Sequence, residues 1–260
     1  MIVESPAVAL SPNALPPVSA HEATCSPVVE LRQYTLHPNQ RDVLVSLFER
    51  EFLETQEAAG IRVLGQFRDL DAPERFVWLR GFPDMTQRRD ALARFYDGPA
   101  WRAHRDAANA TMVDSDDVLL LRPVAPASGF ALDLAAPFTG FDGRSLVVAT
   151  VYAFDAPVDM DFLDFFAADL QPAVAAAGAR VIASFSTEYA ANTFPRLPVR
   201  EGEHVFAWFA RFDDLDAYTR YRETLVGDPG WRTLAVSLAR RLQGPPQVLR
   251  LAPTSRSRLR

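Results

Sequence analysis

The sequence repeats itself, and this repeat constrains the fold more than any other feature. The phrase Asp-Gly-Pro-Ala-Trp-Arg at 97–102 returns as Gly-Asp-Pro-Gly-Trp-Arg at 227–232. Matching positions occur in the same order, first 118 and then 130 residues apart, with a 12-residue insertion within about 186–203. The pairs include Tyr34 and Tyr152, Gly60 and Gly178, Phe67 and Phe185, Trp78 and Trp208, Phe82 and Phe212, and Leu119 and Leu249. Such agreement over two long segments indicates one structural unit used twice.

The pattern of each copy predicts strand, helix, strand, strand, helix, strand. In the first copy, Val28–Leu36 reads as a strand, and 40–59 carries apolar residues at helical spacing before Gly60. The remaining expected elements are strands at 61–67, 75–82 and 118–122 and helices at about 86–95 and 99–112, the last opened by Pro99. This order is that of the ferredoxin-like plait.

Strands such as Val-Leu-Leu-Leu-Arg at 118–122 are apolar on both faces, so the sheet face without helices also needs cover. We therefore predict an α+β fold in which two tandem ferredoxin-like plaits pack sheet to sheet as an intrachain pseudo-dimeric α+β barrel. The expected organisation is a flexible arm at 1–27, a first plait at 28–123, a linker at 124–145, a second plait at 146–253 and an Arg-rich tail at 254–260. Free barrel edges leave homo-oligomerisation open.

Composition excludes several classes of protein. The net charge of −6 and the pI near 5.3 argue against nucleic-acid binding. No apolar run is long enough to span a membrane and the first residues lack a secretory signal, so we expect a cytoplasmic protein without membrane contact. All 27 basic residues are arginine, which excludes a Schiff-base lysine and a Walker-type phosphate loop and is typical of a GC-rich bacterial genome.

No cofactor or metal site is predicted. The chain lacks the glycine-rich, nucleophile-elbow and zinc-helix motifs, and its one cysteine, Cys25, lies with His21 in the predicted arm. The four histidines show no ligand spacing, and the acidic clusters at 114–117 and 159–161 are typical of helix caps or solvated ends.

Four segments resemble the NIPSNAP family of the dimeric α+β barrel superfamily: VVELRQYTLHPNQ, GIRVLGQF, FVWLRGFPDM and DGPAWRAHRDAANATMVDSDDVLLLRP. The resemblance rests on Glu30–Leu36 and on the Trp101 segment with its closing strand, covers 28–123, and leaves 146–253 as a diverged second copy. It implies the barrel fold more firmly than an activity. The superfamily includes cofactor-free monooxygenases acting on polyphenols, isomerases and dehydratases, haem-handling enzymes and, in eukaryotic NIPSNAP members, interaction proteins; no catalytic motif carries over.

Candidate site residues come from comparing the two copies, because polar side chains in the first copy align with apolar or smaller ones in the second. Arg32 aligns with Thr150, Arg80 with Ala210, His104 with Leu234 and Arg105 with Ala235. In the resulting hypothesis His104 is the catalytic base and Arg32 and Arg80 stabilise an anion. The substrate-binding residues would be Tyr34, Trp78, Trp101 and Arg105.

Structural roles for the same residues stay open. Tyr34 and Trp78 also suit a core, Arg32 and Arg80 could pair with Glu30 or Asp84, and His104 could lie on the surface. The first functional hypothesis is a small-molecule enzyme or ligand-binding protein with its pocket in the N-terminal plait, using acid–base or cofactor-independent oxygenase chemistry on an electron-rich substrate. The alternatives are a non-catalytic interaction module that uses 1–27 and 255–260, and haem binding through His104.

Overall fold

The computed structural model describes residues 26–141 and 143–260. Most of the predicted arm, with His21 and Cys25, lies outside these residues. The N-terminal half comprises β1 (Val28–Leu36), α1 (Arg41–Leu47), the π-helical turn η1 (Phe48–Phe52), α2 (Leu53–Ala58), β2 (Arg62–Asp69), β3 (Arg75–Phe82), α3 (Met85–Tyr96), α4 (Pro99–Asn109) and β4 (Met112–Pro123). The C-terminal half comprises β5 (Leu146–Phe154), α5 (Met160–Phe165), the π-helical turn η2 (Phe166–Leu170), α6 (Gln171–Ala176), β6 (Arg180–Thr187), β7 (His204–Phe212), α7 (Leu215–Gly227), α8 (Pro229–Ala239) and β8 (Gln247–Pro253).

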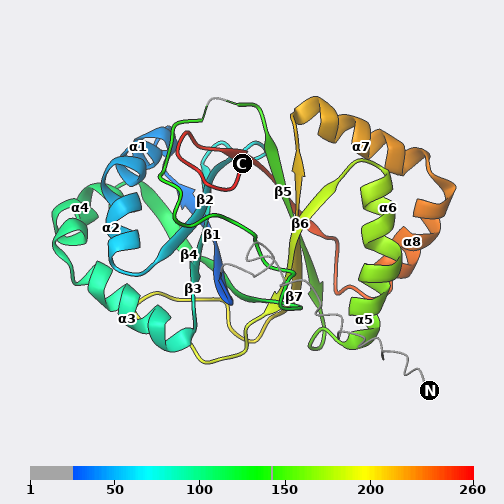
Figure 1. Cartoon of the computed structure of the whole chain (residues 1–260), viewed down its shortest axis with the longest axis horizontal. Coiled ribbons are helices and arrows are strands. Elements are labelled where there is room, and N and C mark those ends of the chain that lie inside the picture. Colours follow the sequence, from blue (N-terminus) through cyan, green and yellow to red (C-terminus); the bar gives the residue numbers. More distant parts are fainter. Residues whose placement is uncertain (1–25, 142) are drawn as a thin grey trace, which may run out of the picture.

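The strands form one closed barrel in the order β1-β3-β2-β8-β5-β7-β6-β4, and all recorded pairs are antiparallel. β2 pairs with β8 and β4 pairs with β6, so each half closes the edges of the other. The helices lie outside the barrel at its two sides, α1–α4 on the left and α5–α8 on the right (Figure 1). The predicted mixed α/β barrel is confirmed.

The barrel interior is an apolar core that both halves fill. Inward side chains of β1, β3, β6 and β7 meet there, and Phe130 of the predicted linker packs between Phe185 and Phe209 at ring-centroid distances of 5.1 and 5.0 Å. Residues 124–145 therefore contribute to the core as well as joining the halves. Two further cores lie between the sheet and the helices, one in each half.

The repeated phrase marks the start of α4 and of α8. Pro99 and Pro229 occupy the first helical turn, and the Asp228 carboxylate accepts a hydrogen bond from the Gly230 N–H at 2.8 Å. Trp101 then packs against Phe52 and Tyr96 at 5.6 and 4.8 Å between ring centroids. The phrase is part of the scaffold in both halves.

Two predicted boundaries were wrong. The expected strand at 118–122 begins at Met112, so the acidic residues 114–117 lie within β4 rather than at its end. Thr35 pairs with Asp114 there, and irregular register along β1 accommodates this polar part of the strand. The helix expected at 99–112 accordingly ends at Asn109.

The Arg-rich tail lies against the N-terminal half. Arg256 pairs with Glu54, Arg258 pairs with Glu57 and stacks 3.9 Å from the centre of the Phe138 ring, and Leu259 is buried. The interaction hypothesis used this segment as a free contact, and its packing argues against that role.

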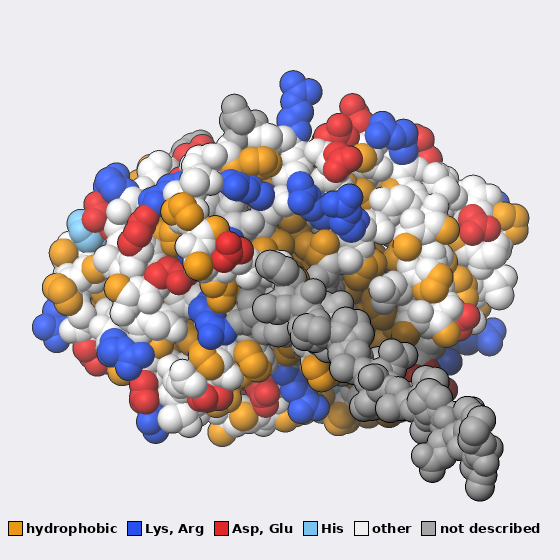
Figure 2. Space-filling view, viewed as in Figure 1, with side chains coloured by type: hydrophobic (Ala, Val, Ile, Leu, Met, Phe, Trp, Pro, Cys, Tyr) orange, Lys and Arg blue, Asp and Glu red, His pale blue; other side chains and the backbone are white. Residues whose placement is uncertain are grey.

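The face in Figure 2 has basic and acidic side chains interspersed over both halves. Within 26–141 and 143–260, no helix is both long and apolar enough to cross a membrane.

Candidate functional site

Each half has a space between its sheet and its outer helices, and the two spaces are built on the same strand register. On β1 and β3, Arg32 lies opposite Trp78; on β5 and β7, Thr150 lies opposite Trp208. The side chains that face the helices decide whether each space is filled or open.

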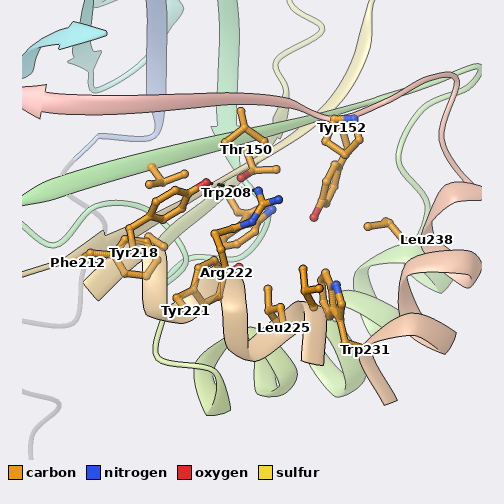
Figure 3. Close-up of a pocket in the computed structure, with 15 residues that line it drawn as sticks. Thr150, Tyr152, Trp208, Phe212, Tyr218, Tyr221, Arg222, Leu225, Trp231 and Leu238 are labelled. Atoms are coloured by element: carbon orange, nitrogen blue, oxygen red, sulfur yellow. Dashed lines mark hydrogen bonds between the residues drawn. The ribbon is translucent and has the colours of Figure 1, made fainter. Parts of the chain in front are cut away.

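The C-terminal space contains a cavity of about 180 Å³ (Figure 3). β5, β7, α7 and α8 supply most of its wall, which is largely apolar and aromatic. The lining residues are Val148, Thr150, Tyr152, Trp208, Ala210, Phe212, Tyr218, Tyr221, Arg222, Leu225, Val226, Trp231, Leu238, Pro246 and Val248. A concave apolar site with a few polar groups is the usual form of a small-molecule site.

Shorter side chains open this cavity. Where the N-terminal half has Arg32 and Arg80 on its sheet, the C-terminal half has Thr150 and Ala210 at the same register positions. Phe52, Phe95 and Tyr96 surround the indole of Trp101 at the start of α4. The C-terminal residues that align with these three rings are Leu170, Leu225 and Val226, which carry no ring. The indole of Trp231 therefore faces the cavity rather than a cluster of rings.

Three polar groups of the wall could orient a ligand. Burial raises the pKa of Tyr152 to about 12, and the neighbouring Trp208 indole opposes this rise only in part. Tyr152 is thus a neutral phenol at physiological pH. The Trp208 N–H lies beside that phenol but meets no acceptor with hydrogen-bond geometry. Arg222 extends from α7 toward Thr150 and Trp208, with Nη1 3.5 Å from the Tyr218 hydroxyl (Figure 3).

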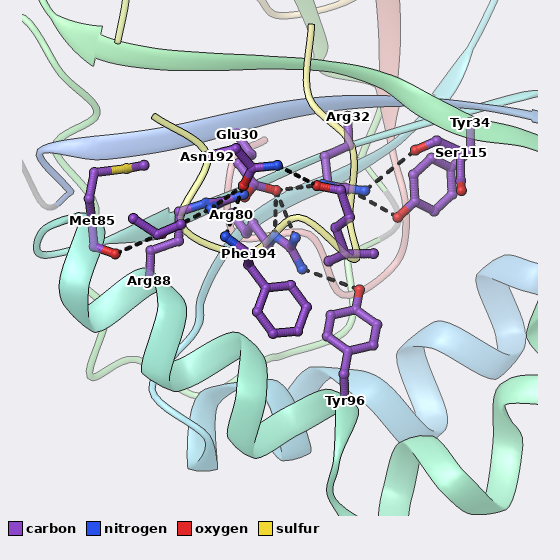
Figure 4. Close-up of polar contacts among 12 residues, drawn as sticks. Glu30, Arg32, Tyr34, Arg80, Met85, Arg88, Tyr96, Ser115, Asn192 and Phe194 are labelled. Carbon is purple, nitrogen blue, oxygen red and sulfur yellow. Dashed lines mark hydrogen bonds and ion pairs between the residues drawn. The ribbon is translucent and has the colours of Figure 1, made fainter. Parts of the chain in front are cut away.

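The N-terminal space is filled by a buried ion cluster around Glu30 (Figure 4). Arg32 Nη1 and Arg80 Nε donate to Glu30 Oε2 at 2.6 and 2.7 Å, and Arg88 Nε donates to Oε1 at 2.6 Å. All four side chains are at most 1% exposed. Both carboxylate oxygens are therefore shared among three guanidinium groups.

Tyrosine and tryptophan rings enclose this cluster. Arg32 Nε donates to the Tyr34 hydroxyl at 3.0 Å, and Arg80 Nη1 donates to the Tyr96 hydroxyl at 3.4 Å. The guanidinium carbons of Arg32 and Arg80 lie 5.6 and 5.1 Å from the centre of the Trp78 ring, within cation–π range. The rings and the charges together hold β1, β3 and α3 in place.

Burial by itself would raise the pKa of Glu30, but the charges of Arg80, Arg88 and Arg32 outweigh it and hold this pKa far below its usual range. The ionised carboxylate therefore stabilises the fold above the unfolded-state pKa of about 4.3, and this contribution is lost as the pH falls towards the folded-state pKa.

Acid is expected to weaken the protein through Glu30. Urea denaturation of the wild type and of Glu30→Gln between pH 7 and pH 3 measures this, because glutamine lacks the titrating group. The difference in unfolding free energy should shrink by about 1.4 kcal/mol for each pH unit below about 4.3. A difference that stays constant down to pH 3 would contradict the assignment.

The structure brings together part of the predicted site. Arg32, Arg80, Tyr34 and Trp78 meet in the Glu30 cluster, so the pairing with Glu30 left open above is the one observed, while Asp84 caps α3. Trp101 joins Tyr34 and Trp78 at a cavity of about 30 Å³, which is room for about one water molecule. The space at these three residues is thus much smaller than the cavity of about 180 Å³ at the corresponding place in the C-terminal half.

His104 and Arg105 lie apart from this cluster. His104 Nε2 is 3.2 Å from Glu51 Oε2 at the surface, and its side chain is 32% exposed. Arg105 is exposed, pairs with Asp106 at 3.4 Å, and shares a surface groove with Trp101. Within the described residues, no group of three or more histidine, cysteine or acidic side chains is arranged to hold a metal ion.

The comparison of the two copies did contain a signal for the cavity. The signal was the small residues of the second copy rather than the polar residues of the first. Thr150, Ala210 and Leu225 are the smaller member of each aligned pair, and small residues against large ones indicate space. The sequence did not indicate that Tyr218 and Arg222 line this cavity, because their position depends on how α7 packs on the sheet.

The closed barrel with outer helices is the architecture of the dimeric α+β barrel proteins, and solved structures share it. The chain is similar to a protein from Fusobacterium nucleatum subsp. nucleatum named "putative monooxygenase", with 10% identity over 90% of this chain and 96% of that one and a TM-score of 0.53. It is also similar to a protein of the same name from Lactobacillus acidophilus (14% identity, 89% and 97% covered, TM-score 0.50). A third is an anthrone oxidase-like protein (13% identity, 87% and 91% covered, TM-score 0.51).

The match to a known protein family lies in the N-terminal half. Residues 29–127 match the model of the NIPSNAP family, and this half of the chain belongs to it, as the resemblance predicted. No curated protein matches the chain significantly.

Proposed function

We propose that the protein binds a small aromatic molecule in the cavity of its C-terminal half. The observation that supports this most strongly is the cavity of about 180 Å³ between two indoles, Trp208 on the sheet and Trp231 on α8. An engineered apolar cavity of about 150 Å³ holds benzene, so this one has the size for one substituted ring or two fused rings. Indole and phenol walls favour a flat ligand that stacks edge-to-face or offset.

The polar groups favour a ligand that carries an oxygen atom. The Trp208 N–H and the Tyr152 hydroxyl are donors, and burial also raises the pKa of Tyr221, which keeps this phenol neutral. A phenol or aryl carbonyl oxygen would accept hydrogen bonds that the protein leaves unused. Arg222 adds a positive charge, which stabilises the anionic form of a phenol.

We further propose that the protein is an enzyme that acts on the ligand bound in this cavity. The names of the structural neighbours, putative monooxygenase and anthrone oxidase-like protein, favour oxidation chemistry. Cofactor-independent oxygenase or acid–base chemistry on an electron-rich substrate would proceed through the substrate anion. In the C-terminal cavity Arg222 and the Trp208 N–H would stabilise this anion, while the neutral tyrosines are donors rather than bases. Arg32 and Arg80, first considered for this role, would instead hold the N-terminal half together.

This division of roles assumes that the halves are tandem ferredoxin-like plaits that diverged from one unit. Supporting it are the π-helical turns at Phe48–Phe52 and Phe166–Leu170 and the register shifts between Val63 and Gly65 and between Val181 and Ala183, which all recur 118 residues apart. One copy would then stabilise the barrel and the other bind the ligand.

Haem binding is not favoured. The Nε2 atom of His104 faces Glu51 at the surface, and the neighbouring cavity of about 30 Å³ is far too small for a porphyrin. The alternative of a non-catalytic interaction module would depend on residues 1–27 alone for its contacts, because residues 255–260 pack on the barrel.

A thermal-shift and tryptophan-fluorescence screen tests the proposal. The probes are phenol, 2-naphthol, naphthalene and cyclohexanol, each titrated into the full-length protein. We expect 2-naphthol to raise the Tm saturably and to quench fluorescence, and cyclohexanol to do neither. If none of the three aromatic probes binds saturably, the proposal is wrong.

The Arg222→Gln variant separates charge from shape. We expect affinity for 2-naphtholate, measured at a pH above the pKa of the ligand, to fall about tenfold, corresponding to about 1.4 kcal/mol. Affinity for naphthalene should change little. Arg220→Gln is the matched control, because Arg220 lies on the same helix outside the cavity lining and should leave both affinities unchanged. Equal losses for both ligands would contradict the role given to Arg222.

A further inference from the structure

The buried cluster of the N-terminal half carries more positive than negative charge. Glu30 is the one carboxylate that pairs with Arg32, Arg80 and Arg88 among the described residues, and all four side chains are buried. Removing a charge from water costs several kcal/mol unless an opposite charge and hydrogen bonds compensate for it. One carboxylate neutralises one of the three guanidinium groups, which leaves a buried excess of positive charge.

Arg88 has the weakest compensation. Its Nε binds Glu30, its Nη1 donates to Asn192 Oδ1 at 3.0 Å and to Thr193 Oγ1 at 3.3 Å, and its buried Nη2 has no hydrogen-bond partner. Burial lowers the pKa of Arg88, against the opposing charge of Glu30. Arg88 Nη1 thus donates to two neutral oxygen atoms, whereas the oxygen atoms of an anion would be stronger acceptors.

Asn192 and Thr193 belong to the strap, residues 188–203 between β6 and β7, which crosses from the C-terminal half over the cluster. The strap is held at its rim by Arg196 with Asp97 and by Arg200 with Asp117, at 2.9 and 3.0 Å. These pairs are half-exposed, and such pairs contribute little to stability. Phe194 also anchors the strap, because its buried ring stacks on Tyr96 at 6.0 Å. A ligand would therefore replace only the two side-chain contacts of the strap to Arg88, while the strap itself stays in place.

We propose that Arg88, with Arg80 beside it, is a binding site for a small oxyanion, a carboxylate or a phosphate, whose oxygen atoms replace Asn192 Oδ1 and Thr193 Oγ1. The planar guanidinium group binds two oxygen atoms of such an anion side by side, which a single halide ion cannot match. Glu30 acts as a positioning residue, because it fixes Arg88 through Nε and leaves the two Nη groups for the ligand.

The C-terminal half has no counterpart of this site. Val148, Thr150, Ala210 and Tyr218 align with Glu30, Arg32, Arg80 and Arg88, so the corresponding space has no charged cluster. The oxyanion site is thus independent of the aromatic cavity, and either proposal can fail without the other.

Two variants at Asn192 test the site. Asn192→Asp places a carboxylate next to Arg88, whereas Asn192→Ala removes the same side-chain amide, including its hydrogen bond to the Leu197 carbonyl, without adding charge. The Tm of the full-length wild type and of both variants is measured in sodium acetate and in sodium phosphate series, each against sodium chloride at equal ionic strength.

For the wild type and Asn192→Ala we expect a saturable rise in Tm of roughly 3 °C at tenfold the Kd. For Asn192→Asp we expect this rise to be lost, because its own carboxylate occupies the site. The salt that gives the rise identifies the ligand as carboxylate or phosphate. No saturable rise in the wild type with either salt would overturn the proposal, as would an equal rise in Asn192→Asp and Asn192→Ala, which indicates a general salt effect.

Discussion

The Glu30→Gln variant is expected to lower the free energy of unfolding by about 3–5 kcal/mol at pH 7, because it leaves three buried guanidinium groups without a counter-charge. This is a large part of the stability of an ordinary domain. Denaturant unfolding followed by circular dichroism measures the loss.

Glu203→Gln is the matched control for this prediction. Glu203 pairs with Arg200 but is 36% exposed, and exposed pairs contribute about 0–1 kcal/mol. If both variants lose the same small amount of stability, the cluster around Glu30 does not hold the N-terminal half together.

The Ala210→Leu variant is expected to abolish aromatic binding. Ala210 lies on β7 with its side chain on the cavity wall and is 1% exposed, so a leucine there takes space that the ligand needs. We expect affinity for 2-naphthol to fall by at least about 100-fold, corresponding to about 2.7 kcal/mol. Filling the cavity should also raise the stability of the unliganded protein by about 1 kcal/mol. Titration calorimetry and urea denaturation measure the two effects.

Val236→Leu controls for the added bulk. Val236 lies on α8 and is 54% exposed, away from the cavity lining, so this variant should bind as the wild type does. If Ala210→Leu binds 2-naphthol with unchanged affinity, the ligand occupies another place and the cavity assignment is wrong.

The sequence could predict the barrel because its strongest signals are local and repeated. The strand-forming run Val28–Leu36, Gly60 after the first helix and Pro99 in the first turn of the last helix each specify one element, and the second copy specifies them again. The same strand parity brought Arg32, Tyr34, Trp78 and Arg80 to one face of the sheet, where the structure places them.

The chemistry of that face could not be predicted in the same way. Glu30 pairs with Arg88 of α3, and the strap covers this pair through Asn192. These partners lie at least 58 positions apart in the sequence, so no local pattern predicts the contacts. The polar residues of the first copy suggested a site, whereas most of them form a packed ion cluster. Space is a property of packing, and it opened where Thr150 and Ala210 are small.

A crystal structure with 2-naphthol bound tests the central claim most directly, since it locates the ligand. The account predicts electron density for the ring between Trp208 and Trp231, with its oxygen near the Trp208 N–H and Arg222. Density in the groove beside Trp101 and Arg105, with the C-terminal cavity unchanged, would contradict it.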